Sequence, residues 1–247
     1  MIRAGYWNRD LDGRLSIGGG LDPFKITEGV YQVGGPDITD PEDCCFFLVD
    51  LGRPVLIDAG AGVQPRKLVR NLGELGYSPR DVKLVVLTHC HIDHVGGAVF
   101  LHEKYGLPLA IHELDAPPLE EGDNRRTAAN WYGMDLAPTQ VKYHLEGAGG
   151  SIEGGASSVR WIHTPGHTPG SISLFIDNGM YRILFGQDIH GPFYASFGSD
   201  IDAWGESMRL LLDLEADILC EGHFGVIRPA TEVKAYIEGY LRNYNQF

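Results

Sequence analysis

The side chains best suited to chemistry lie in one short segment, residues 89–94, which reads His-Cys-His-Ile-Asp-His. Imidazole nitrogens and a carboxylate oxygen are ligands that Zn²⁺ uses and that Fe and Mn ions also accept. If the segment starts extended, alternate side chains point the same way, so His89, His91 and Asp93 share a face. His94 joins them only if the chain turns into a helix there. One ion cannot easily take four ligands from so short a stretch, whereas two adjacent ions can.

The residues around this segment predict the elements that hold it. The apolar run at residues 84–88 is typical of a buried strand, and Gly96-Gly97 suits a tight passage from strand to helix. Three later apolar strands each lead into a turn with small residues, and these turns carry His167, Asp188 and His223 respectively. Each alone could simply cap a turn. Together with residues 89–94 they predict a site, because catalytic groups collect on loops held by a rigid sheet.

Strands and helices alternate along the chain without a convincing linker. Apolar runs bounded by Gly and Pro predict strands at residues 29–34, 44–50, 54–58, 83–88, 107–111, 159–163, 171–176, 181–185 and 217–220. Helical spacing of apolar residues predicts helices at residues 64–75, from about 94 to 105, 203–214 and 229–244. The pattern weakens from 113 to 150, where we expect an irregular insertion that could cover the active site.

Composition indicates an ordinary globular enzyme rather than a membrane or nucleic-acid-binding protein. The chain has 247 residues, of which 43% are hydrophobic and 21% charged, and it contains no apolar run near the roughly 20 residues that a membrane span needs. The formal net charge is −13, and no Lys/Arg run is present. So acidic a chain is a poor partner for phosphate backbones, and we expect no nucleic-acid partner.

The cysteines and the first residues favour a cytoplasmic protein. Cys44 and Cys45 are neighbours, and Cys90 and Cys220 each stand beside a candidate ligand, so the four cysteines form no disulfide framework. Residues 1–7 lack the apolar core of a signal peptide. Tyrosine-rich segments would permit a homodimer, but the sequence does not determine the oligomeric state.

Five motifs, in order, resemble those of the metallo-β-lactamase-fold hydrolase superfamily, in its glyoxalase II-like and lactonase-like branch. They are Leu-Ile-Asp-Ala-Gly at residues 56–60, the run from Thr88 to Gly97, Pro-Gly-His-Thr-Pro-Gly-Ser at 165–171, Gly-Gln-Asp at 186–188 and Gly-His at 222–223. The resemblance implies an α/β (α+β) fold: a four-layer αββα sandwich of two mixed sheets flanked by helices. We expect a single domain of this kind over residues 1–247.

The resemblance also implies a ligand set. By that likeness His89, His91 and His167 bind a first ion, Asp93, His94 and His223 bind a second, and Asp188 bridges the two. Asp58 looks like the family's carboxylate that orients a ligand loop. The expected cofactors are two divalent ions, with Zn²⁺ favoured and Fe or Mn as alternatives, because the same ligands serve all three.

This set predicts a hydrolase that needs no Ser or Cys nucleophile. Two neighbouring ions would give a bridging hydroxide at neutral pH, which attacks a carbonyl-type carbon while one ion polarises the substrate oxygen. Asp93 is placed to orient the nucleophile and accept its proton. His190 and Tyr194 follow the bridging Asp188 in a loop that we expect to border the cleft. Either could touch substrate there as an oxyanion donor or a proton donor, and the sequence leaves this contact open. The predicted substrate is a small-molecule ester, thioester or lactone.

Three questions stay open at this stage. Trp131, Tyr132 and Met134 could form an apolar wall over the metals or a small satellite core. A mononuclear iron dioxygenase of the persulfide dioxygenase type would keep the same motifs, holding Fe with equivalents of His89, His167 and Asp188. A non-catalytic sensor on the same fold is the third alternative, although the complete ligand set argues against it.

Overall fold

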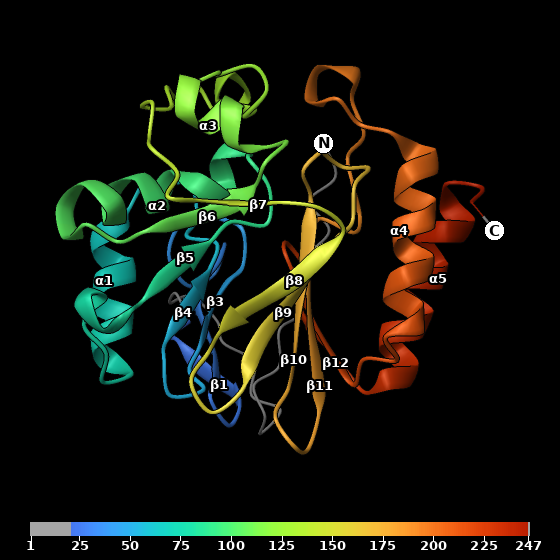
Figure 1. Cartoon of the computed structure of the whole chain (residues 1–247), viewed down its shortest axis with the longest axis horizontal. Helices are drawn as coiled ribbons and strands as arrows, with labels where there is room; N and C mark the ends of the chain where they lie inside the picture. The colour runs from blue at the N-terminus through green and yellow to red at the C-terminus, as the bar shows by residue number, and fades with distance from the viewer. Residues whose placement is uncertain (1–20, 247) are drawn as a thin grey trace.

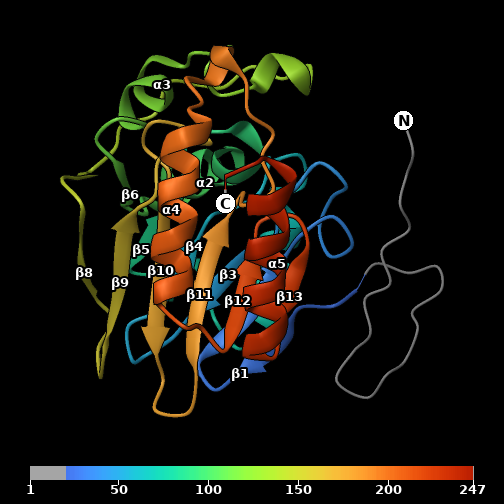
Figure 2. The same cartoon turned by 90° about the vertical axis from the view of Figure 1, so that its right-hand side faces the viewer.

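Two β-sheets face each other, and helices cover their outer faces (Figure 1). The computed structural model describes residues 21–246, so residues 1–20 and 247, including the segment 1–7 and the ends of the expected single domain, lie outside the described part. Helices α1 and α2 flank one sheet, and α4 and α5 lie across the outer face of the other (Figure 2). The predicted αββα architecture with two mixed sheets is therefore confirmed.

The first sheet has seven strands, which lie side by side in chain order. They are β1 (Phe24–Thr27), β2 (Val30–Gly34), β3 (Phe46–Val49), β4 (Val55–Ile57), β5 (Leu84–Val86), β6 (Leu109–His112) and β7 (Tyr143–Leu145). Neighbours from β1 to β4 are antiparallel, whereas those from β4 to β7 are parallel. The helices on this side are α1 (Pro65–Glu74), α2 (Ile92–Tyr105) and the short α3 (Ala116–Glu121).

The second sheet has six strands in the spatial order β13-β12-β11-β10-β9-β8. They are β8 (Gly149–Glu153), β9 (Ser158–His163), β10 (Ile172–Asp177), β11 (Arg182–Gln187), β12 (Ile218–Glu221) and β13 (Gly225–Ile227). All neighbours are antiparallel except β11 and β12, which are parallel. The helices on this side are α4 (Ile201–Asp213) and α5 (Ala230–Asn243).

Strand alternation divides the core into three apolar layers. In β3, Phe46 and Leu48 pack in the layer under α1 and α2, whereas Phe47 and Val49 pack between the sheets. The ring of Phe47 meets that of Phe185 from β11, with 5.5 Å between the centroids. Successive side chains of a strand point to opposite faces, so an unbroken apolar run predicts a strand covered on both sides, as seen here.

Every predicted strand and helix is present, with ends that differ by a few residues. One shift matters for the site: α2 begins at Ile92 rather than at about His94, with His91 directly before it. Asp93 therefore lies in the first turn of a helix, and the expectation that it shares an extended face with His89 and His91 was wrong. The helix itself brings Asp93 and His94 to the site.

The segment from 113 to 150 is more regular than predicted. It contains α3, a 3₁₀ helix (Ala129–Trp131), β7 and the first residues of β8. β7 and β8 are edge strands of different sheets, so this connection carries the chain from one sheet to the other. Their side chains are mostly exposed, which leaves no apolar run to reveal them. The short outer strands β1 and β13 were missed as well.

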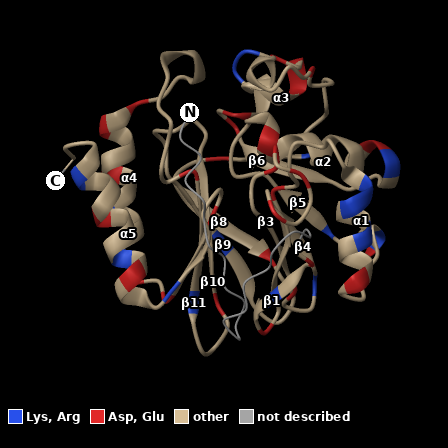
Figure 3. Cartoon of the chain, turned by 180° about the vertical axis from the view of Figure 1, so that it is seen from behind, with Lys and Arg blue, Asp and Glu red and all other residues tan. Residues whose placement is uncertain are grey.

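Charged residues of both signs are spread over the surface, and the helices of the described part are not of the membrane-spanning kind. Figure 3 shows Lys and Arg in separate places, including α1 and α5, with acidic residues beside and between them. Within residues 21–246, no helix has both the length and the apolar character required to cross a membrane.

Two helical glycines allow α2 to approach the loop after β4. A Cβ atom on Gly97 would lie 1.9 Å from the carbonyl oxygen of Ala59, and one on Gly96 would lie 1.9 Å from that of Ala61. Gly97 also donates its N–H to the carbonyl of Gly60 at 2.9 Å. The glycine pair is needed for this helix-to-loop contact, and not only for the turn into the helix.

We predict that Gly97→Ala lowers the free energy of unfolding by about 1–3 kcal/mol, because backbone atoms must move to admit the methyl group. Denaturant unfolding of the variant measures this. Gly73→Ala is the matched control: Gly73 is also helical, and its added Cβ would meet no atom within 4 Å. It should be neutral or stabilise by up to about 1 kcal/mol. Equal effects of the two substitutions would contradict the proposed close approach.

Candidate metal centre

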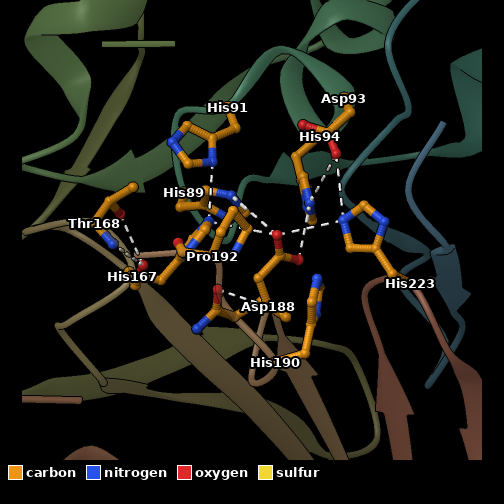
Figure 4. Close-up of polar contacts among 12 residues, drawn as sticks. His89, His91, Asp93, His94, His167, Thr168, Asp188, His190, Pro192 and His223 are labelled. Carbon is orange, nitrogen blue, oxygen red and sulfur yellow. Dashed lines mark hydrogen bonds and ion pairs between the residues drawn. The ribbon is translucent and has the colours of Figure 1, made fainter. Parts of the chain in front are cut away.

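The predicted ligands converge at the carboxyl ends of strands from both sheets (Figure 4). His89 and His91 lie in the passage from β5 to α2, and Asp93 and His94 lie in the first turn of α2. His167 comes from the loop between β9 and β10, Asp188 follows β11 directly, and His223 lies in the turn between β12 and β13. The site therefore exists only when the two sheets pack against each other.

One group of side chains brings together the ligand atoms of His89, His91, His167 and Asp188, all within 4.8 Å of one another. His167 Nε2 lies 2.9 Å from His91 Nδ1 and 3.4 Å from Asp188 Oδ2. All four residues are buried. Four such donors at this spacing can surround a single ion.

A second group contains Asp93, His94 and His223, again within 4.8 Å. His223 Nε2 lies 3.3 Å from Asp93 Oδ2 and 3.3 Å from Asp188 Oδ2. His94 Nε2 lies 3.2 Å from Asp188 Oδ1. The carboxylate of Asp188 thus stands between the two groups, with one oxygen near His167 and His223 and the other near His94.

Outer hydrogen bonds fix which ring nitrogen faces the site. Asp58 Oδ2 accepts from His94 Nδ1 at 2.9 Å and from the Thr88 hydroxyl at 2.8 Å. Because that hydroxyl donates to Asp58, its oxygen accepts from His89 Nδ1 at 3.1 Å. The carbonyl oxygen of Pro192 accepts from His167 Nδ1 at 2.9 Å. In each ring the other nitrogen, Nε2, then faces the centre.

Several buried polar atoms that face the centre lack a hydrogen-bond partner. His89 Nε2, His94 Nε2 and Asp188 Oδ1 are buried and have no hydrogen-bond partner. An unprotonated ring nitrogen beside a carboxylate oxygen repels it, and a buried polar atom without a partner costs about 1–3 kcal/mol. A cation removes both penalties at once. The residues present therefore fit divalent metal ions.

The protonation states agree with this fit. Burial, reinforced by neighbouring imidazoles, lowers the pKa of His89 and of His91 well below the ordinary histidine value. Burial likewise lowers the pKa of His167 to about 4. Burial opposes ionisation of Asp93, but the charges of His94 and His223 outweigh it and lower its pKa to about 2. Burial opposes protonation of His94 and His223 too, but the negative charges around them outweigh it and raise the pKa of both well above the ordinary histidine value. Metals bind neutral imidazoles and ionised carboxylates, so an ion at the second group would displace the protons of these two rings.

Two carboxylates outside the predicted set hold the ligand loops in place. Asp115 is fully buried; it accepts from the N–H of Cys90 at 3.0 Å, from the Thr168 hydroxyl at 2.7 Å and from the N–H of Gly170 at 2.8 Å. It thereby joins the His89–His91 passage to the loop that carries His167. No local motif surrounds Asp115 in the sequence, and only the tertiary contacts reveal it.

Glu221 is the second such carboxylate. It is fully buried, and it accepts from the N–H groups of His223 at 2.6 Å and Phe224 at 2.9 Å. Its other oxygen lies 3.1 Å from His190 Nδ1. Its place directly before Gly222-His223 was the available signal, since a carboxylate two residues before a candidate ligand can hold the turn.

The predicted substrate-contacting residues lie at the side of the centre. The ring of His190 is 4.9 Å from that of His223 and is partly exposed. Tyr194 is exposed and contacts Trp131. Tyr132 packs against the core under α1 and α2, and burial together with the nearby charge of Asp93 raises its pKa.

The structure also shows where Met134 and Trp131 lie, the other two residues that could form either an apolar wall over the metals or a small satellite core. Met134 also packs against the core under α1 and α2, so it takes the satellite-core alternative, whereas Trp131 remains exposed. Cys90 and Cys220 are buried in two different apolar layers.

Comparison with known proteins gives the family. The family model of the metallo-beta-lactamase superfamily matches residues 44–223, which include all seven converging side chains. The chain belongs to the metallo-beta-lactamase superfamily. Divalent metal binding is therefore implied by the family as well as by the donor set.

Relatives within this hydrolase superfamily cover most of the chain. A probable metallo-hydrolase of Bacillus subtilis (strain 168), YflN, is 30% identical over 72% of this chain and 75% of its own length. A beta-lactamase-like protein 2 homolog of Drosophila melanogaster is 31% identical over 90% of this chain and 72% of its own. An uncharacterized protein of Mycobacterium tuberculosis (H37Rv), Rv2581c, is 33% identical over 82% of this chain and 91% of its own length.

Solved structures agree in fold. A metallo-beta-lactamase of Cronobacter sakazakii superposes with a TM-score of 0.76 at 19% identity, covering 92% of this chain and 97% of its own. BJP-1, a subclass B3 metallo-beta-lactamase of Bradyrhizobium japonicum, gives a TM-score of 0.74 at 21% identity, covering 92% of this chain and 94% of its own. Identities this low establish the shared fold and leave the substrate open.

We predict that Asp58→Asn weakens divalent-metal binding by about 10–100-fold, because the amide removes the charge that holds Thr88 and His94. Competition with a chromophoric chelator measures the affinities. Asp177→Asn is the control, since that exposed carboxylate pairs with Arg160 and Arg182 at the far end of β10. Unchanged affinity in Asp58→Asn would exclude the orienting role.

Proposed function

We propose that this member of the metallo-beta-lactamase superfamily is a dinuclear metal-dependent hydrolase that cleaves a small-molecule ester, thioester or lactone. The observation that supports the proposal is the pair of donor groups on either side of the Asp188 carboxylate, together with the buried, unpaired atoms that face the centre. Zn²⁺ is the expected ion at both positions, and Fe and Mn ions suit the same donors.

In this proposal His89, His91 and His167 hold the first ion, Asp93, His94 and His223 hold the second, and Asp188 contacts both. Bound divalent ions lower the pKa of water toward neutrality and polarise a substrate carbonyl. The protein's own contribution is to keep the donors rigid. Asp58 and Asp115 tie the ligand loops from behind, so the geometry does not need to be rebuilt at each turnover.

Asp93 and His190 are the residues proposed to handle protons. Asp93 Oδ2 lies beside His223 Nε2, where it can orient the attacking water and accept its proton. His190 Nδ1 is held by Glu221, which leaves Nε2 directed away from that carboxylate. A partly exposed imidazole oriented in this way can donate a proton to the leaving group or to the substrate oxygen.

The completeness of the second donor group favours two ions over one. A mononuclear iron site would use His89, His167 and Asp188 as ligands, and it would not need His94 as a ligand. Yet Asp58 orients His94 at 2.9 Å and holds it fully buried beside Asp188. The four cysteines are buried as well, so a thiol nucleophile is not part of the proposal.

The first test is metal analysis of protein purified without chelators, combined with a substrate panel. We expect about two divalent ions per chain, and hydrolysis of at least one ester, thioester or lactone that is lost on chelation and restored by Zn²⁺. The same panel includes phosphodiesters, β-lactams and a persulfide with oxygen-uptake detection. One Fe per chain with persulfide-dependent oxygen uptake would establish the dioxygenase alternative instead.

The second test removes single ligands. His91→Ala and Asp188→Ala should lower the metal content and reduce turnover by more than about 100-fold, because loss of a direct ligand exceeds the effect of losing an outer partner. His144→Ala is the matched control: His144 lies on β7 and pairs with Glu120. Wild-type turnover at full metal content in either ligand variant would remove that residue from the proposed site.

A further inference from the structure

Two strongly exposed aromatic side chains stand together beside the metal centre. Trp131 is 54% exposed and Tyr194 is 46% exposed, and their ring centroids lie 4.9 Å apart at an interplanar angle of 73°. They come from distant parts of the chain: Trp131 ends the 3₁₀ helix between α3 and β7, and Tyr194 follows Asp188 in the loop before α4. Single exposed apolar side chains are normal, whereas exposed apolar side chains that adjoin one another commonly mark a ligand or partner site.

A third ring connects this pair to the candidate ligands. Phe197 is buried and lies 4.9 Å from the ring of Trp131 and 5.6 Å from that of Tyr194. On its other side, the Phe197 ring lies 4.4 Å from the imidazole of His91. Trp131, Tyr194 and Phe197, the aromatic wall, thus run without interruption from a candidate metal ligand out to solvent.

Both halves of the wall are tied to the loops that carry the ligands. On the Trp131 side, the carbonyl oxygen of Thr127 accepts from the N–H of Ile92 at 2.8 Å, next to His91. On the Tyr194 side, the Ser199 hydroxyl donates to the carbonyl oxygen of His167 at 2.6 Å and accepts from the N–H of Tyr194 at 3.0 Å. The wall is therefore fixed relative to the centre, and its rings are arranged before any ligand binds.

We propose that the aromatic wall binds an extended apolar acyl group of the substrate, with the carbonyl end of that group at the metal centre. This inference rests on the proposed hydrolase function and narrows its substrate to esters, thioesters or lactones with a hydrophobic acyl chain. Edge-to-face rings present a broad apolar surface with little conformational freedom to lose, which suits a flexible alkyl chain. The contact between Phe197 and His91 brings the aromatic wall up to the metal centre, and this favours a substrate group over a separate protein partner as the ligand of the wall.

The test measures binding of acetate, butyrate and hexanoate to the metal-loaded protein by calorimetry. These carboxylates resemble the acid product, so the head group should bind at the centre and the chain along the wall. A fully buried methylene improves affinity about fourfold. Because the wall covers one side of the chain, we expect about twofold for each methylene, or about 15-fold from acetate to hexanoate.

Trp131→Ala should reduce the ratio of hexanoate to acetate affinity to about threefold or less, whereas Trp131→Phe should retain most of it. Met180→Ala is the control, because Met180 is 73% exposed in the turn before β11, at the opposite end of that strand from Asp188. It should keep the wild-type ratio. A flat chain-length series in the wild type, or the same ratio in Trp131→Ala as in the wild type, would overturn the proposal.

Hydrolysis of matched acetyl and hexanoyl thioesters separates the two proposals. If carboxylate binding depends on chain length and on Trp131 but no ester, thioester or lactone is cleaved, the wall stands and the hydrolase function fails. If both thioesters are cleaved equally well by the wild type and by Trp131→Ala, the hydrolase function stands and the wall fails. Light scattering adds a further outcome: a wild-type dimer that dissociates in Trp131→Ala would make the pair a subunit interface and overturn the proposal.

Discussion

The crowding of imidazole nitrogens and carboxylate oxygens at the centre is the constraint on which the rest of the structure depends. His94 donates from Nδ1 to Asp58, so its Nε2 points at Asp188 Oδ1, only 3.2 Å away, and this contact is favourable only with a proton or a cation between the two atoms. His167 is arranged in the same way by the carbonyl of Pro192. Without protons or cations between these atoms the arrangement is unfavourable, and the surrounding fold must hold it together. With cations, the same geometry becomes a preformed binding site.

The sandwich supplies that rigidity by dividing the site between its halves. The first sheet and α2 carry four of the converging side chains, and the second sheet carries the other three. The apolar layer between the sheets, in which Phe47 meets Phe185, sets the distance between these halves. Asp115 adds a direct polar link, because it lies on the side of the first sheet and holds the His167 loop of the second. Packing between the sheets and metal geometry are thus coupled.

Features of the fold and the site that depend on residues close together in the sequence could be predicted, whereas those that depend on contacts between distant residues mostly could not. Residues 89–94 are a local motif after an apolar run, so the site and its ligand types could be inferred, and the family resemblance supplied the pairing of distant strand ends. The position of Asp93 on a helix was missed, because the alternation of side chains along a strand was assumed to continue to residue 93, whereas α2 already begins at Ile92. The edge strands β7 and β8 have few buried side chains and left no apolar pattern. Asp115 acts through tertiary hydrogen bonds that no spacing rule encodes, whereas Glu221 stands two residues before His223 and only its contact with His190 joins distant parts of the chain.

Anomalous diffraction from crystals of the metal-loaded protein tests the central claim most directly. We predict two metal peaks about 3.5–4 Å apart, one among His89, His91 and His167, the other among Asp93, His94 and His223, with the carboxylate of Asp188 contacting both. A single ion with the second group left without metal at saturating Zn²⁺, or ions bound away from these seven side chains, would contradict it.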